Sequence, residues 1–84
     1  MSLNRAAAVA MVDGPRAALV LIDALDTDLD RYYLLHAARA DLLRRLGSWQ
    51  AAGESYARAL ALVTNDAERR FFDRRLREVE SRQG

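Results

Sequence analysis

Two apolar-patterned segments joined by a Gly-Ser break, at residues 32–62, constrain the fold of this chain more than any other feature. The stretch reads YYLLHAARADLLRRLGSWQAAGESYARALAL and mixes small residues, such as Ala40 and Ala52, with larger apolar ones, such as Leu43 and Tyr56. Small and large residues at helical spacing are typical of two antiparallel helices that pack closely. Such a pair cannot bury its own apolar faces, so we expect further helices on either side.

The same helical spacing extends along the whole chain, and no segment shows the alternation of apolar and polar residues that is typical of a strand. The fold class is therefore predicted to be all-α, as a single domain over residues 1–84. The pattern predicts five helices, which span residues 4–12, 15–25, 29 or 30 to 46, 48–63 and 66–81.

Glycines mark two of the predicted helix ends. Gly14 follows the first helix and Gly47 follows the third, and both are expected to take the left-handed conformation of a residue just past a helix. Pro15 is suited to open the second helix, because a helix needs no backbone N–H at its first position.

Polar residues mark the other ends. Asn4 is the expected N-cap of the first helix, and Ser48 of the fourth, whereas Asn65 with Glu68 forms the pattern of a capping box. Residues 26–28, Asp-Thr-Asp, are predicted to end the second helix, with Asp28 or Asp30 capping the third.

The first two helices repeat the next two at an offset of 34 residues. The matched positions are Ala6 with Ala40, Val9 with Leu43, Val12 with Leu46, Ala18 with Ala52, Ile22 with Tyr56, and Leu25 with Ala59. This period and the helical-hairpin unit resemble the tetratricopeptide (TPR) repeat. The resemblance implies two antiparallel hairpins, with the fifth helix, which follows a different offset, as a C-terminal capping helix.

Composition excludes several classes of protein. The chain has no Cys, so it has neither a disulfide framework nor a thiol nucleophile. Its net charge of +1 gives no general attraction to nucleic acid or anionic membrane. The longest apolar run, residues 17–22, is far shorter than a membrane span, and no signal-peptide pattern is present. We expect a cytoplasmic protein.

Candidate catalytic or metal-binding residues are few. His36 has neither a nucleophile nor a metal-ligand pattern around it, so a packing role is expected. The aspartates of residues 23–30 lack the Gly and terminal Glu of a calcium loop. We therefore predict a non-enzymatic protein without cofactor or metal, in which Trp49 staples the fourth helix to the third.

The fifth segment is rich in Arg, which raises the alternative of phosphate or nucleic-acid binding. Acidic residues are interleaved four positions away, in the pairs Asp66–Arg70, Asp73–Arg77 and Glu78–Arg82. Phe71 and Phe72 are expected to plug the last hairpin. A solvated capping helix is the favoured interpretation of this segment.

Three stretches together resemble one family: NRAAAVAMVDGPRAALVLIDAL, YYLLHAARADLLRRLG, and AAGESYARALAL followed by NDAERRFFDRRL. They are similar to the C-terminal TPR-like extension of extracytoplasmic-function RNA polymerase sigma factors. The resemblance implies a fragment of a transcription initiation factor, without the promoter-reading regions, and residues 1–3 fit a cloning remnant. The expected partner is protein, either the sigma regions of the same protein or the RNA polymerase core, and direct DNA binding is not expected.

The first helix of each TPR hairpin lines the concave binding surface, so the resemblance also implies candidate protein-binding residues. On the third helix these are Arg39, Asp41, Arg44 and Arg45, and on the first helix they are Asn4, Arg5 and Ala8. Two alternatives stay open: a free-standing TPR-like adaptor unrelated to transcription, and a small helical nucleic-acid-binding domain. A homodimer through the exposed first helix is also expected.

Overall fold

Five α-helices follow one another in the computed structural model, which describes residues 3–29 and 32–83, without the side chains of residues 3–4 and 25–29. They are α1 (Leu3–Asp13), α2 (Pro15–Leu29), α3 (Tyr33–Arg45), α4 (Trp49–Leu62) and α5 (Asp66–Gln83). No strand occurs in these described ranges, so the all-α prediction is confirmed. Each helix packs on its neighbour in sequence, and α1 also contacts α3.

The glycine stops are confirmed. Gly14 has φ 95° and Gly47 has φ 77°, the left-handed conformation that glycine adopts without a Cβ clash. Pro15 begins α2 directly after the first of these glycines. After α3, the amide of Ser48 donates to the carbonyl of Leu43 at 2.9 Å, which is the long hydrogen bond of a Schellman motif. The chain therefore reverses tightly between α3 and α4.

The predicted break at residues 26–28 is wrong. These residues continue α2, which ends at Leu29, four residues beyond the predicted end. Neither Gly nor Pro is present there, and Asp alone costs a helix well under 1 kcal/mol. The N-cap position of α3 is Tyr32, in an extended conformation and without a side-chain cap, and Asp28 lies within α2, so Asp28 is not the cap. Asp30 itself lies outside the described residues.

The other predicted caps have mixed outcomes. α1 already begins at Leu3, so Asn4 lies within the helix and is not its N-cap. Ser48 does occupy the N-cap of α4, without a side-chain cap bond. The Asn65 side chain accepts hydrogen bonds from the amides of Ala67 at 2.8 Å and Glu68 at 3.1 Å, which confirms the Asn65 side of the predicted capping box.

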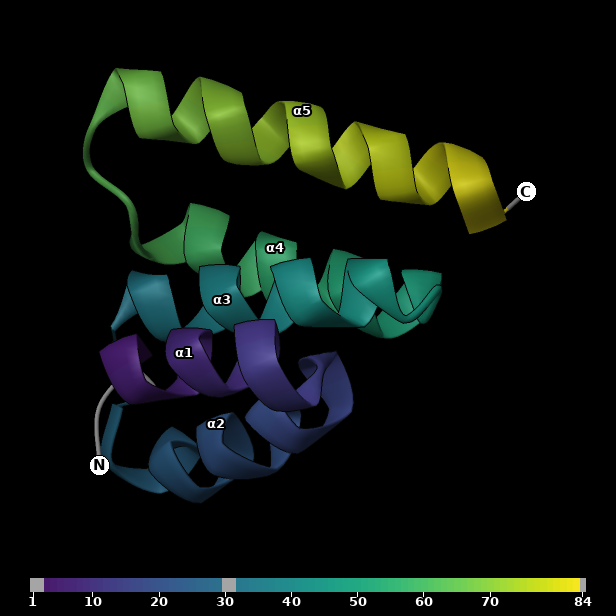
Figure 1. The fold of residues 1–84 in the computed structure, drawn as a ribbon. Coiled ribbons are helices and arrows are strands. Elements are labelled where there is room, and N and C mark those ends of the chain that lie inside the picture. The colour runs from purple at the N-terminus through teal and green to yellow at the C-terminus, as the bar shows by residue number, and fades with distance from the viewer. Residues whose placement is uncertain (1–2, 30–31, 84) are drawn as a thin grey trace.

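Helix α3 lies between two apolar clusters. In Figure 1, α1 and α2 lie below it and α5 lies above it. The first cluster joins it to α1 and α2, and its buried members are Ala6, Ala18, Ile22, Leu35 and Leu42. The second joins it to α4 and α5, and its buried members are Ala40, Leu43, Ala52, Tyr56, Ala59, Val63, Phe72 and Val79. Leu19 packs against both clusters. The core is thus continuous through the molecule, with α3 at its centre.

Most of the core positions predicted from the 34-residue offset are buried, but Val9 and Leu46 are half-buried and Val12 is exposed. Val12 is 82% exposed, because it lies on the side of α1 that no other described helix covers. Its predicted counterpart, Leu46, is half-buried beside the α3–α4 turn. Leu25 lies among the residues whose side chains are not described.

Helix α5 lies along α4 (Figure 1). It packs on the core through Phe72 and Val79, which are both buried. Phe71, predicted to plug the same hairpin, is 47% exposed, because a residue one position from Phe72 points about 100° away around the helix. At Gly53 the two helices approach closely: a Cβ there would lie 3.4 Å from Gln83 Nε2.

Candidate protein-interaction surface

Arg39 connects three helices, α2, α3 and α4. Its Nε donates to Oδ1 of Asp23 on α2 at 2.9 Å, and its Nη1 lies 3.5 Å from Oγ of Ser55 on α4. Both contacts span 16 residues of sequence. Arg39 therefore connects α3 to α2 and α4, and its role in binding a partner stays a prediction.

Asp41 lies between two guanidinium groups. Its carboxylate accepts from Arg44 at 2.6 Å and from Arg45 at 2.9 Å, over one turn of α3. One carboxylate thus balances two cations, which leaves an excess positive charge at this point. The Arg45 side chain is 52% exposed and the Asp41 side chain 34%, so both are accessible to a partner.

Arg44 points toward the interior. Its hydrogen bond to Asp41, and a second to the Tyr56 hydroxyl, raise the pKa of Arg44 above its usual value. Burial raises the pKa of Tyr56 despite the nearby guanidinium. The Nε of Arg44 is buried without a hydrogen-bond partner. The contact with Tyr56 connects α3 to α4, while 29% of the Arg44 side chain stays exposed.

A groove of about 230 Å³ runs between α1 and α3. It is mostly apolar, with Asp41 and Arg45 as its charged residues, and its lining consists of Ala7, Ala10, Met11, Ile22, Ala38, Asp41, Leu42 and Arg45. A concave apolar surface with a few charged groups is the usual form of a protein or ligand site. Of the predicted site residues, this groove brings together Asp41 and Arg45.

The predicted α1 residues are not those of the groove. Arg5 is exposed but does not line it, Ala8 is exposed without lining it, and the side chain of Asn4 lies outside the described residues. The lining residues are Ala7 and Met11. The 34-residue offset could have identified these two residues, since it matches Ala7 to Asp41 and Met11 to Arg45.

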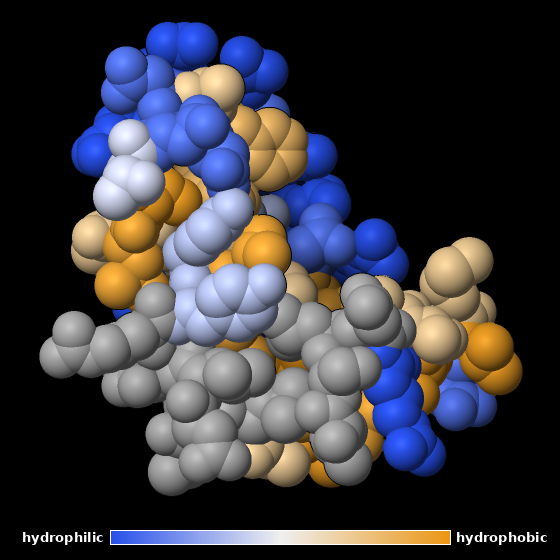
Figure 2. Space-filling view, turned by 90° about the vertical axis from the view of Figure 1, so that its left-hand side faces the viewer, coloured by the Kyte–Doolittle hydropathy of each residue, from blue (hydrophilic) through white to orange (hydrophobic). Residues whose placement is uncertain are grey.

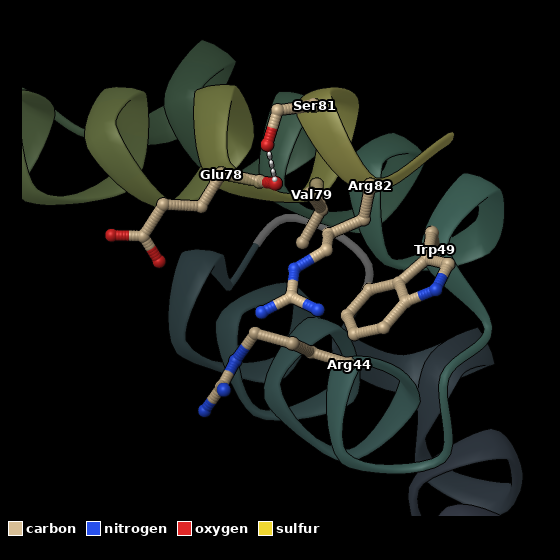
Figure 3. Close-up of a pocket in the computed structure, with 6 residues that line it drawn as sticks. All are labelled: Arg44, Trp49, Glu78, Val79, Ser81 and Arg82. Carbon is tan, nitrogen blue, oxygen red and sulfur yellow. Dashed lines mark hydrogen bonds between the residues drawn. The ribbon is translucent and has the colours of Figure 1, made fainter. Parts of the chain in front are cut away.

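A second hollow of about 310 Å³ lies between the α3–α4 turn and the end of α5 (Figure 3). The Arg82 guanidinium lies over the Trp49 ring, 5.5 Å from its centroid, and Figure 3 shows it between this ring and the Arg44 stem. Trp49 therefore fixes α4 to α5 as well as packing on the core. Ser81 Oγ donates to the Glu78 carbonyl at 2.7 Å, so it is occupied within its own helix.

The arginines of α5 are partly paired. Arg77 binds Asp73 at 2.9 Å, as predicted, whereas Glu78 binds Arg75 at 3.2 Å in place of Arg82. No ion pair joins Asp66 to Arg70 among the described residues. The upper part of the molecule in Figure 2, where Figure 1 places α5, is mostly hydrophilic. This surface is a solvated helix face of mixed charge.

His36 is buried, 2% exposed, at the α3–α4 side of the core, as expected for a packing residue. Within the described ranges, no three His, Asp or Glu side chains are grouped closely enough to hold a metal ion. No described helix is long and apolar enough to cross a membrane.

The chain is similar to a protein whose name states no activity. An uncharacterized protein of Rhizobium meliloti (strain 1021) is 41% identical over 68 residues, which cover 81% of this chain and 16% of that protein. The chain thus matches a small part of a much longer relative. No protein-family model matches the chain. No solved structure matches it either.

Proposed function

We propose that this chain is a non-catalytic, TPR-like interaction domain with a regulatory role in a cytoplasmic transcription initiation factor of the extracytoplasmic-function sigma class. The groove between α1 and α3 carries this proposal, because it offers an apolar floor beside the half-exposed guanidinium of Arg45. The partner is a protein segment, from the sigma regions of the same protein or from the RNA polymerase core, that presents an apolar side chain and a carboxylate.

Two observations support the TPR-like description. Residues matched at the 34-residue offset have similar burial in the two hairpins: Ala6 with Ala40, Ala18 with Ala52, and Ile22 with Tyr56. The first helices of the two hairpins, α1 and α3, contact each other, as stacked repeats require. The match of this chain to a small part of a longer relative suits a domain that works within a larger protein.

The test uses the purified chain as bait, offered RNA polymerase core, isolated sigma regions of the class, and labelled duplex DNA. Retention of either protein, lost with Arg45→Glu, is the expected result. The matched control is Arg74→Glu, which reverses a charge on the exposed side of α5 and leaves the groove unchanged. Equal losses with both variants would refute the groove as the binding site.

Retention of DNA alone, with a steep decrease as salt increases, would favour the nucleic-acid alternative and overturn the proposal. Capture of neither transcription protein would leave the free-standing adaptor as the better description.

A further inference from the structure

The hollow between the α3–α4 turn and the end of α5 is lined by two guanidinium groups, those of Arg44 and Arg82. Its volume of about 310 Å³ lies within the range of small-molecule sites, about 300–1,000 Å³. Figure 3 shows the Arg82 guanidinium between the Trp49 ring and the Arg44 stem. Two like charges that line one hollow repel each other, and an anion bound between them removes that repulsion.

The Arg82 guanidinium has unused hydrogen-bond donors. It lies over the Trp49 ring, 5.5 Å from the ring centroid, and makes no ion pair or hydrogen bond with any other described residue. A guanidinium carries five N–H donors in a planar fork that matches two oxygens of one anion. The Trp49 side chain holds this fork in place but offers no oxygen acceptor, so the donors stay available.

The acidic residue of the hollow does not neutralise Arg82. Glu78 binds Arg75 at 3.2 Å on the same helix. Figure 3 shows the Glu78 carboxylate extending away from the Trp49 ring, over which Arg82 lies. The positive charge of Arg82 is therefore open to an anion from solution.

Arg44 supplies a second cation that is only partly balanced. Its partner Asp41 accepts from Arg44 at 2.6 Å and also from Arg45 at 2.9 Å, so one carboxylate serves two guanidinium groups. The Nε of Arg44 has no hydrogen-bond partner. The hollow thus combines one unpaired guanidinium with one that shares its counter-charge.

This combination favours a phosphate monoester over other anions. A phosphate monoester carries a charge of about −1.5 to −2 and three acceptor oxygens, which suits two guanidinium groups, whereas a carboxylate carries a single charge. Nucleic acid needs a continuous run of cations. The arginines of α5 are instead interrupted by acidic residues, Asp73, Glu78 and Glu80.

We propose that this hollow binds one phosphate monoester group, with Arg82 as its main hydrogen-bond donor and Arg44 as the second cation. The group is either free phosphate or the phosphorylated side chain of a peptide. The site goes beyond the proposed function and does not depend on it, because neither arginine lines the α1–α3 groove.

Titration of the chain with inorganic phosphate tests the site, at constant ionic strength and about pH 7.5, where phosphate is mainly dianionic. Trp49 is the only Trp in the chain and contacts Arg82, so its fluorescence reports on the hollow. We expect a saturable change with Kd on the order of 1 mM. A short phosphoserine peptide is titrated in parallel: tighter binding than inorganic phosphate identifies a phosphorylated segment as the source, and weaker binding identifies the free anion.

Arg82→Gln should weaken phosphate binding about tenfold or more, because it removes a charged pair of hydrogen bonds. This substitution also changes the surroundings of Trp49, so phosphorus NMR of the phosphate measures the affinity of each variant without relying on fluorescence. The matched control is Arg74→Gln, which removes the same charge from an exposed position of α5 outside the hollow and should keep the affinity. Circular dichroism establishes that both variants are folded.

The absence of saturable binding, or equal losses with Arg82→Gln and Arg74→Gln, would overturn the inference, since equal losses indicate a non-specific effect of charge. Tighter binding of duplex DNA than of either phosphate probe, lost with Arg82→Gln, would overturn it in favour of a nucleic-acid site. If phosphate binds through Arg82 while the chain retains no transcription protein, the phosphate site stands and the proposed function alone fails.

Discussion

Replacing Leu35 with Ala tests whether the two apolar clusters on α3 form one cooperative core. Leu35 is fully buried on the side of α3 that faces α1 and α2. Buried Leu→Ala substitutions cost about 2.7–5 kcal/mol through lost burial and the cavity that remains. We expect about 3 kcal/mol here. An 84-residue domain has a total stability of about 4–13 kcal/mol, so this loss is a large part of it.

The measurement is urea unfolding followed by two probes. Circular dichroism reports all the helices, whereas the fluorescence of Trp49, the only Trp in the chain, reports the α4–α5 side. Leu19 packs against both clusters, so the α1–α2 hairpin should unfold together with the rest. The free energy of unfolding measured with each probe should therefore fall by about 3 kcal/mol, and the midpoint of thermal unfolding should fall by about 12–24 °C.

Leu34→Ala is the matched control, since Leu34 is adjacent on α3 and 40% exposed. It should cost less than about 1 kcal/mol. The single core would be refuted if the circular-dichroism transition of the Leu35→Ala chain moved to lower urea while its Trp49 fluorescence kept the midpoint of the unsubstituted chain. A loss no larger than that of Leu34→Ala would refute the assigned burial itself.

Three further predictions rest on local geometry. Gly47→Ala should lower the free energy of unfolding by about 1 kcal/mol, because Gly47 has a positive φ. Gly53→Ala should raise it by about 0.5–1 kcal/mol, since Gly53 is helical with room for a Cβ. Opposite shifts of the thermal midpoint check both. Asn65→Ala removes the acceptor of two amide hydrogen bonds and should cost about 1 kcal/mol in urea unfolding, and an unchanged midpoint would contradict the cap. A hydrogen bond to Glu68 raises the pKa of Tyr33 and burial raises that of Tyr56, so both phenols favour the folded state below pH 10.0, and this stability should be lost as pH rises above that value. Phenolate absorbance that rises before the helix signal falls would show that these hydroxyls are not engaged.

The sequence predicted the helices well where the local chemistry is decisive. Gly14 and Gly47 end helices because their backbone conformation favours glycine, and Asn65 caps α5 through its own side chain. The error at residues 26–28 arose where no such residue is present. Polar residues alone do not end a helix, and the length of α2 depends on contacts with the rest of the fold. Such contacts are not encoded in any short stretch of sequence.

The two-sided nature of α3 was also only partly predictable. Ala40 and Leu43 were identified from their match to the repeat, but Leu35 and Leu42 face the other cluster and carry no repeat signal of their own. A helix that packs on both sides has core residues around most of its circumference. Its polar residues then occupy narrow strips between the two packed sides. Which strip holds a given arginine depends on where the neighbouring helices lie.

The contacts of each arginine on α3 decide whether its substitution can test the binding surface. Arg39 bridges α2 and α4, and Arg44 bonds Asp41 and the buried Tyr56, so reversing either charge would disturb packing as well as any partner contact. Arg45 has half its side chain exposed at the groove and can be reversed with less structural cost. Loss of binding in an Arg39 or Arg44 variant would therefore be ambiguous, whereas loss in a folded Arg45→Glu chain would place the partner in the α1–α3 groove.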